Sequence, residues 1–156
     1  LHLSIRRQRQ MCIRDSYYTV PLGKADVKRE GKDITVFTYG LCVNYCMQAA
    51  DILAADGISV EIVDLRTVYP LDKETIIERA KMNGKILLIT EDNLEGSVMS
   101  EVSAIIAENC LFELDAPIMR LAGPDVPSMP FSPNLENEVM MNPDKILEKM
   151  RELAQF

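Results

Sequence analysis

The sequence contains no tryptophan and a single histidine, His2. Most acid–base, nucleophilic and metal chemistry in proteins uses imidazole, so few catalytic classes are open to this chain. It has no GxxxxGK[ST] loop, no GxGxxG turn after a strand and no GxSxG elbow. These absences argue against nucleoside-triphosphate, dinucleotide and hydrolase sites. No apolar run approaches the roughly 20 residues that span a bilayer, so we expect no membrane partner.

Basic residues are also in short supply. The 156 residues include 17 Lys and Arg against 24 Asp and Glu, which gives a formal net charge of −7. An acidic surface repels phosphate backbones, so we expect no nucleic-acid partner. Apolar residues make up 47% of the chain, which suffices for one domain with its own core.

The first sixteen residues differ from the rest of the chain. They hold four of the 17 basic residues and one of the 24 acids, which leaves 13 bases against 23 acids in residues 17–156. RRQRQMCIRDS, residues 6–16, resembles translated sequencing-adapter sequence. The segment is not a secretory signal, because it lacks a continuous apolar stretch followed by a small-residue cleavage site. We therefore predict that residues 1–16 are non-native, and His2 and Cys12 with them.

Three cysteines remain, Cys42, Cys46 and Cys110. Their odd number and their spacing fit neither an all-cysteine zinc site nor a mixed cysteine–histidine site. We interpret them as buried small hydrophobes in a reducing compartment. Together with the missing secretory signal, this favours a bacterial cytoplasmic location.

Strand-like and helical patterns alternate along most of the chain. Strands are expected at 34–39, 59–65, 85–90 and 118–122, and helices at 43–55, 73–83, 97–109 and 143–153. This alternation predicts βαβ units, a parallel sheet and helices on both of its faces. The polar residues 17–33 are interpreted as a connecting segment, and residues 34–156 as the domain.

Several helix ends have clear local signals. Asp72 and Asn142 are predicted N-caps, and Pro143 suits the first helical position after Asn142. Gly57 and Gly84 are predicted to end helices, because glycine readily adopts the left-handed conformation that follows a helix.

The connection between the last strand and the last helix, residues 123–141, has little predicted regular structure. Its prolines recur at every third position: Pro124, Pro127, Pro130 and Pro133. This is the period of a polyproline II helix. Two interpretations stay open: a PxxP ligand for a partner domain, or a rigid loop packed on its own domain by Val126, Met129 and Phe131. Long loops in compact domains are often functional, so the segment is a candidate interaction site.

Acidic residues follow two of the predicted strands. Asp64 stands where a receiver domain carries its phosphoacceptor, but the acids that hold Mg²⁺ after the first strand are missing. Glu91 and Asp92 follow the third strand. Adjacent residues of an extended segment point to opposite sides, so these two would not converge on one proton. We interpret them as surface or interface carboxylates.

Four segments carry a resemblance to a known family. They are YTVPLGKADVKREGKDITVFTYG (18–40), VDLRTVYPLD (63–72), TEDNLEGS (90–97) and RLAGPDVPSMPFSP (120–133). With them, residues 18–156 resemble the C-terminal transketolase-like domain of the beta subunit of thiamine-diphosphate-dependent 2-oxo acid dehydrogenases. That family acts on pyruvate, branched-chain 2-oxo acids or acetoin. The resemblance implies a three-layer α/β/α fold with a mostly parallel sheet of about five strands and one antiparallel edge strand. We assign residues 34–39 to the antiparallel strand.

The resemblance also implies where the chemistry lies. In the family, thiamine diphosphate and Mg²⁺ bind between the alpha subunit and the N-terminal domain of the beta subunit. The diphosphate motif of alpha and the activating glutamate of that N-terminal domain have no counterparts in this sequence. We therefore expect no catalytic, cofactor-binding or metal-binding residue here, and no activity from the fragment alone.

The implied role is assembly into an α2β2 enzyme and docking of the small basic domain of the dihydrolipoyl acyltransferase core. The candidate docking residues are Asp115, Asp125 and Phe156 with its terminal carboxylate. The candidate subunit-interface residues are Glu91, Asp92, Pro124, Pro127 and Phe131. The alternative is an independent flavodoxin-like module that binds a small ligand or a protein. Neither the residues nor the resemblance decides which substrate the complete enzyme uses.

Overall fold

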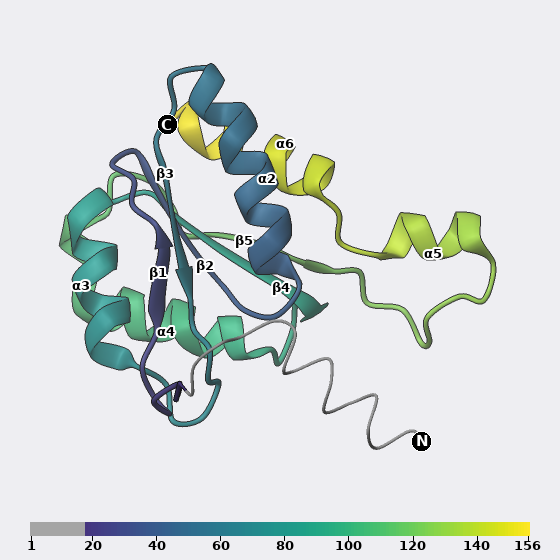
Figure 1. Cartoon of the computed structure of the whole chain (residues 1–156), viewed down its shortest axis with the longest axis horizontal. Helices are drawn as coiled ribbons and strands as arrows, with labels where there is room; N and C mark the ends of the chain where they lie inside the picture. The colour runs from purple at the N-terminus through teal and green to yellow at the C-terminus, as the bar shows by residue number, and fades with distance from the viewer. Residues whose placement is uncertain (1–17) are drawn as a thin grey trace.

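The computed structural model describes residues 18–156, so the segment that we predict to be non-native, 1–16, lies outside the described residues (Figure 1). Within 18–156, no helix combines the length and the apolar character that crossing a bilayer requires.

A five-stranded sheet forms the centre of the domain, in the order β1-β3-β2-β4-β5 (Figure 1). The strands are β1 (Asp26–Arg29), β2 (Ile34–Thr38), β3 (Val60–Asp64), β4 (Ile86–Asn93) and β5 (Met119–Gly123). β1 pairs antiparallel with β3, and all other pairs are parallel. All of β2 and most of β3 are buried, as is typical of parallel strands covered on both faces. The predicted sheet is confirmed.

The antiparallel strand is not the one that we expected. The assignment of residues 34–39 to it is wrong, because these residues form β2, which pairs parallel with both β3 and β4. The antiparallel edge strand is β1, inside the segment 17–33 that we interpreted as a connection. β1 has the sequence DVKR, with one apolar residue. Its pairing with β3 therefore depends on tertiary contacts rather than on its own pattern.

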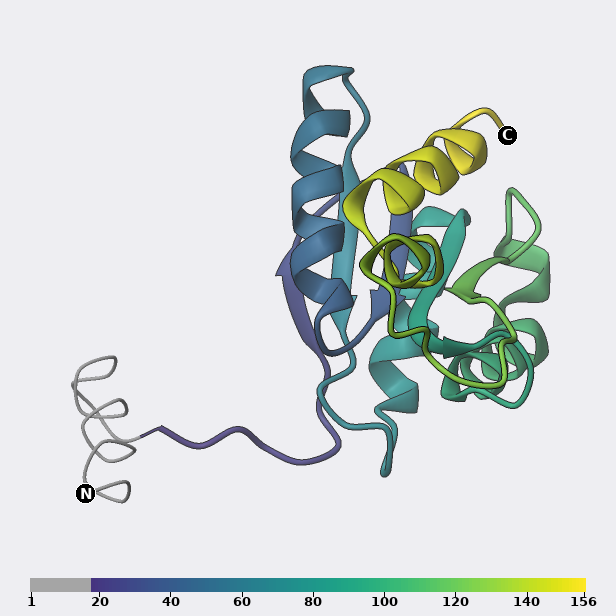
Figure 2. The same cartoon turned by 90° about the vertical axis from the view of Figure 1, so that its right-hand side faces the viewer.

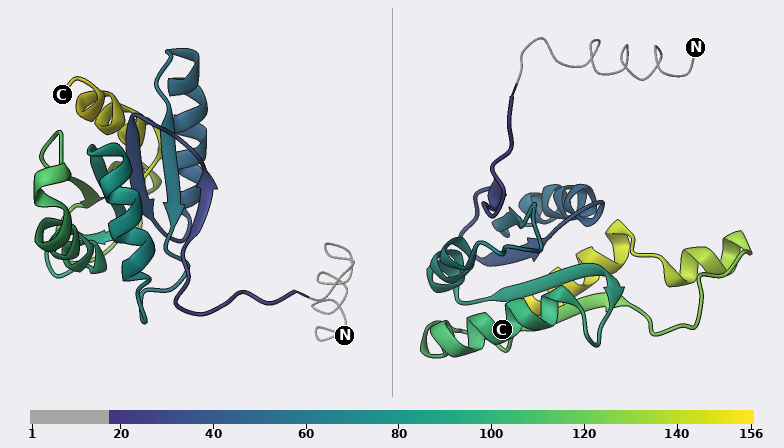
Figure 3. Two further views of the ribbon diagram at one scale, coloured as in Figure 1. Left: turned by 90° about the vertical axis from the view of Figure 1, so that its left-hand side faces the viewer. Right: turned by 90° about the horizontal axis from the view of Figure 1, so that it is seen from below.

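Helices cover both faces of the sheet (Figures 2 and 3). One layer holds α2 (Cys42–Ala55) and α6 (Pro143–Ala154), and the other holds α3 (Lys73–Asn83) and α4 (Val98–Cys110). Side chains of each strand alternate between the layers, so Val36 packs with α2 and α6 while Phe37 packs with α3 and α4. The expected α/β/α sandwich is therefore present.

The predicted helix ends are confirmed. Asp72 caps α3 by accepting from Thr75 N at 3.3 Å, and Asn142 caps α6 by accepting from Lys145 N at 2.9 Å. Gly84 ends α3 with a φ of +66°, and Gly57 follows α2 with a φ of +83°.

The three described cysteines are buried and free, as expected. Cys42 and Cys46 lie in α2 beside the end of β2. Burial raises the pKa of the Cys42 thiol to about 12, and the negative charge of Glu91 adds to the rise. Burial also raises the pKa of Cys46. These thiols are protonated at neutral pH and serve as core residues.

A buried carboxylate in β3 joins this strand to β2 and to α3. Glu61 in β3 accepts hydrogen bonds from Thr35 Oγ1 at 2.8 Å and from Arg79 Nη1 at 2.9 Å. Burial raises the pKa of Glu61, and its bond from Thr35 and the charge of Arg79 oppose that rise. In the turn between β1 and β2, a Cβ on Gly31 would lie 2.2 Å from Glu61 N, so only glycine allows this close approach.

Residues 124–141, which we call the arm, leave β5 and project from the body of the domain (Figure 1). The expectation of little regular structure is wrong for part of it, since Pro133–Val139 form helix α5. The loop interpretation, in which Met129 and Phe131 pack on their own domain, is also wrong. Met129 is exposed and Phe131 fully so, while Val126 is half-buried.

Candidate functional site

The loops gather at the two ends of the sheet. The carboxyl edge is the end where β2 to β5 finish and where residues 18–25 lead into β1. The amino edge is the opposite end, formed by residues 82–85, 111–117 and 155–156. In open parallel sheets, ligands and partners bind preferentially beyond the carboxyl ends of the strands.

Exposed large hydrophobic side chains are concentrated at the carboxyl edge. Ten of the fifteen in the described part of the chain lie there: Tyr18, Val20, Leu22, Leu41, Val68, Tyr69, Leu94, Met129, Phe131 and Leu135. Met82, Leu111, Phe112 and Phe156 lie at the amino edge, and Ile52 lies on α2. These side chains lie on separate segments at that end of the sheet: residues 18–22, the loops after β2, β3 and β4, and the arm. The carboxyl edge therefore offers more exposed apolar side chains than the amino edge.

A groove of about 380 Å³ separates the arm from the ends of β4 and β5. Its walls include Glu91, Gly123, Val126 and the thioethers of three methionines, Met129, Met140 and Met141. A Cβ on Gly123 would lie 2.9 Å from Glu91 O, so glycine lets the two strand ends approach. Unbranched methionine side chains give a groove of this kind an adaptable apolar lining.

The structure brings the five predicted interface residues to the carboxyl edge. Glu91 and Asp92 are exposed at the end of β4, where the Asp92 carboxylate accepts from Asn93 N at 2.9 Å. Pro124, Pro127 and Phe131 belong to the arm. Their contact with another subunit stays a prediction.

The predicted docking residues are divided between the two edges. Asp115 is exposed at the amino edge, and its backbone N donates to Gly84 O at 2.9 Å. The C-terminal residues lie beside the same turn, because Lys85 Nζ donates to Ala154 O at 3.4 Å (Figure 2). Asp125 lies instead at the carboxyl edge, where its Oδ1 accepts from Asn93 Nδ2 at 3.4 Å.

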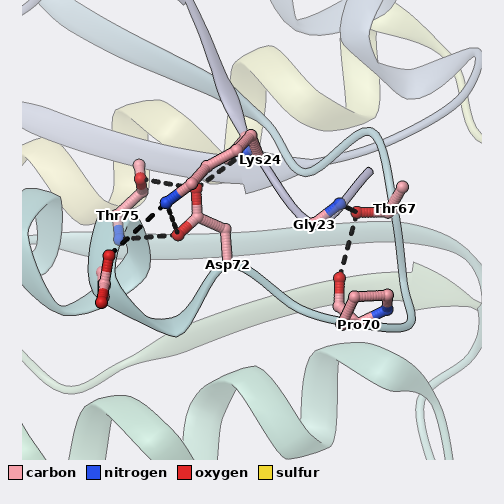
Figure 4. A network of polar contacts seen from close by, with 8 residues as sticks. Gly23, Lys24, Thr67, Pro70, Asp72 and Thr75 are labelled. Atoms are coloured by element: carbon pink, nitrogen blue, oxygen red, sulfur yellow. Dashed lines mark hydrogen bonds and ion pairs between the residues drawn. The ribbon is translucent and has the colours of Figure 1, made fainter. Parts of the chain in front are cut away.

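The N-terminal segment is fastened to the carboxyl edge by a polar network, which we call the clamp (Figure 4). The Asp72 carboxylate accepts from Ala25 N at 3.0 Å and from Thr75 Oγ1 at 2.8 Å. Thr67 Oγ1 accepts from Gly23 N at 3.0 Å and donates to the Pro70 carbonyl at 3.1 Å. The VDLRTVYPLD segment therefore fixes the direction in which the chain enters β1.

Asp72 keeps its charge in this buried position. Burial acts to raise the pKa of Asp72, but the hydrogen bonds from Ala25 N and Thr75 outweigh it and hold the pKa below its usual value. Lys24 Nζ, 3.6 Å from the carboxylate, adds to the lowering. The network has the character of a structural joint rather than of a proton-transfer site.

Two features of the edges were missed from the sequence. Phe112 is 97% exposed in the short helix η1 (Leu111–Glu113), directly beside the predicted docking position Asp115. Leu135 is exposed on α5. The only sequence signal for the exposure of Phe112 was the apolar pair Leu111–Phe112 directly after a helix. Two apolar residues at that position are equally compatible with burial in the core.

Residues 23–146 of this chain match the family model of the transketolase C-terminal domain. The chain belongs to this family. Membership decides against an independent flavodoxin-like module.

Curated relatives of this transketolase C-terminal domain are dehydrogenase beta subunits, which confirms the expected resemblance. The 2-oxoisovalerate dehydrogenase subunit beta of Bacillus subtilis is 67% identical over 139 residues, which cover 89% of this chain and 42% of that protein. The acetoin:2,6-dichlorophenolindophenol oxidoreductase subunit beta of the same organism is 41% identical over 89% of this chain and 40% of its own length. Its pyruvate dehydrogenase E1 component subunit beta is 39% identical over 99% of this chain and 47% of its own length. The chain therefore spans less than half the length of these relatives.

A solved structure shows the same fold. The split-gene transketolase described as an inactive beta4 tetramer superposes with a TM-score of 0.77 at 22% identity. The match covers 88% of this chain and 44% of that one. It supports the three-layer architecture with its mostly parallel sheet.

The described residues do not fit the cofactor that the resemblance implies. Among residues 18–156, no three His, Cys, Asp or Glu side chains come close enough to hold a metal ion. The sequence also lacks the diphosphate-binding motif.

Proposed function

We propose that this chain is the C-terminal domain of the beta subunit of a branched-chain 2-oxo acid dehydrogenase, in which it serves assembly and docking. The proposal of a branched-chain 2-oxo acid as substrate rests on the 67% identity with the 2-oxoisovalerate dehydrogenase subunit beta. The acetoin and pyruvate relatives from the same organism reach 41% and 39%. Decarboxylation itself belongs to the complete α2β2 enzyme with thiamine diphosphate and Mg²⁺, and we place that enzyme in the cytoplasm.

The apolar carboxyl edge supports the assembly role. It gathers ten exposed hydrophobic side chains and the five candidate interface residues on the side of the sheet where the chain enters the domain. We assign this edge to contacts with the rest of the beta subunit, the alpha subunit and a second beta subunit. Burying such a surface against partners is the usual source of stability in obligate assemblies.

The amino edge supports the docking role. Asp115 and Phe156 both lie at this edge, and Phe112 adds an exposed aromatic ring to it. Carboxylates around an aromatic anchor suit a small basic domain such as that of the acyltransferase. Asp125 lies at the other edge, so Asp115 and Phe156 carry this assignment.

A domain exchange tests the proposal. Residues 18–156 replace the matching segment of the Bacillus subtilis 2-oxoisovalerate dehydrogenase subunit beta, which is then produced with its alpha subunit. We expect an α2β2 enzyme that oxidises 2-oxoisovalerate within a few-fold of the parent rate, because the exchanged domain holds no reacting group. The control exchange uses the matching domain of the Bacillus subtilis pyruvate dehydrogenase subunit beta and should assemble less well.

Two results would contradict the proposal. One is an exchanged subunit that folds but does not join the alpha subunit, while the control exchange does. The other is oxidative decarboxylation of 2-oxoisovalerate by the 156-residue chain without any alpha subunit.

A further inference from the structure

The arm has no support from its own domain over most of its length. None of the seven residues of α5 is buried, and both Phe131 and Leu135 are exposed. An isolated helix shorter than about 12 residues is marginal in water, so α5 needs a surface to pack against. The exposed aromatic ring of Phe131 is the kind of side chain that anchors a protein interface.

The base of the arm is fixed. Met141 is buried in the core beneath α2 and α6. Lys145 Nζ donates to the carbonyl oxygens of Glu138 at 2.6 Å and Met140 at 2.8 Å, which holds the last turn of α5 against the start of α6. The arm itself projects away from the sheet (Figure 3).

The charge of the arm restricts its partner. Residues 124–141 contain three acids, Asp125, Glu136 and Glu138, and no Lys or Arg. A second copy of this domain offers little free positive charge, since residues 17–156 hold 13 bases against 23 acids. At least eight of those bases already lie within 4.0 Å of carboxylates of their own chain.

The arm and the point where the chain enters the domain lie at opposite edges of the sheet. The chain enters at β1, which is one edge strand of the sheet, and the arm leaves from β5, the other edge strand. Four strand spacings of about 4.8 Å place these points roughly 19 Å apart.

We propose that the arm docks, through Phe131 and Leu135 with Glu136 and Glu138 beside them, into an apolar pocket bordered by Lys and Arg on a different chain of the assembly. This inference rests on the proposed function, because it needs an assembly with a second kind of chain. It makes the arm the element that selects unlike subunits, since its negative charge disfavours pairing with another acidic copy of the domain.

Photo-crosslinking from the tip of the arm identifies the partner. In the complete enzyme, assembled from full-length subunits, Phe131 is replaced by p-benzoylphenylalanine and the irradiated product is mapped by mass spectrometry. We expect a crosslink to a chain other than beta, at an apolar position next to Lys or Arg. The same probe at Ile52, exposed on α2, is the matched control. A crosslink to a beta chain, or none above the control, would overturn the proposal.

Charge reversal on the arm gives a second readout. The double variant Glu136→Lys/Glu138→Lys should weaken association of full-length beta with its partner on the order of tenfold at low salt, and less at high salt. The control Glu101→Lys/Glu108→Lys makes the same change in net charge on exposed positions of α4 and should leave association unchanged. Equal or tighter association of the arm variant would overturn the proposal.

The domain exchange and the crosslink together distinguish this inference from the proposed function. If the domain-exchanged enzyme is active but the crosslink maps to beta, this inference alone fails. If that enzyme does not assemble, the proposed function fails as well.

Discussion

At the scale of single residues, Gly31 shows how one missing atom positions a turn. A Cβ there would meet Glu61 N and the Val60 carbonyl carbon at 2.2 Å, and neither backbone atom can move without disturbing β3. We predict that Gly31→Ala lowers the free energy of unfolding by more than about 2 kcal/mol. Urea unfolding of the 156-residue chain measures the effect.

The neighbouring Lys32→Ala is the matched control for Gly31→Ala, because the Lys32 side chain is exposed. It should change stability by less than about 0.5 kcal/mol. Equal stability of the Gly31→Ala and parent chains would show that the turn can move away from β3.

Asp72 gives a prediction that depends on pH. Its folded-state pKa is lowered, so its contribution to stability is fully present above the unfolded-state value of about 3.9 and is lost as the pH falls through the folded-state pKa. We predict that Asp72→Asn costs about 2 kcal/mol at pH 7, because charged hydrogen bonds to Ala25 N and Thr75 become neutral ones.

The pH series of the Asp72→Asn variant separates charge from packing. The stability difference between parent and variant, measured by urea unfolding, should shrink as the pH is lowered below about 4. A difference that stays constant from pH 7 to pH 3 would mean that the carboxylate charge contributes nothing.

At the scale of elements, α6 depends on its N-cap. Asn142 Oδ1 accepts from Lys145 N at 2.9 Å, and the helix buries Ile146, Met150 and Leu153 against the sheet. We predict that Asn142→Ala costs about 1 kcal/mol, while Asn142→Asp stays within a few tenths because aspartate is an equally good cap. Thermal or urea unfolding of both variants is the measurement, and equal losses in the two would rule out a capping effect.

Elements with local signals could be predicted from the sequence, whereas those set by distant contacts could not. The caps at Asp72 and Asn142 and the buried strands β2 and β4 follow from neighbouring residues. β1 was missed because DVKR becomes a strand only by pairing with β3, and the direction of a strand is not encoded in its own pattern. α5 was missed because none of its residues is buried, so it lacks the apolar stripe that predicts a helix.

The residues of the candidate site could likewise be predicted only in part from the sequence. Asp115 and Phe156 were named from a family resemblance, and the structure places both at the amino edge. Asp115 precedes β5 and Asp125 follows it, so the two lie at opposite ends of that strand, as the predicted strand 118–122 already implied. Phe131 was named both as a packing residue of the loop and as a candidate interface residue, because an exposed aromatic side chain and a buried one look alike in a sequence.

At the scale of the whole molecule, the two edges make a docking test possible. We predict that Asp115→Arg weakens binding of the acyltransferase to the full-length α2β2 enzyme on the order of tenfold at low salt, and less at high salt, because it reverses a charge that faces a basic partner. Decarboxylation in solution should be unchanged. Calorimetric titration at two salt concentrations measures the affinity.

Removing Phe156 should also weaken acyltransferase binding, since this residue lies at the same edge as Asp115. Asp125→Arg shows whether docking extends to the carboxyl edge, and we expect it to leave the affinity unchanged. Unaltered affinity in both Asp115→Arg and the Phe156 deletion would rule out docking at the amino edge.

The clamp has a mechanical consequence. A flexible tether would let two domains of one subunit swivel and would transmit only their separation. Here the chain is held at Gly23 and again at Ala25 before it enters β1, so it is already part of the rigid body when it arrives. The length of chain that can move freely ahead of the domain therefore ends at Gly23, three residues before β1 begins. Whatever holds the residues upstream is linked to the sheet by a correspondingly shorter tether.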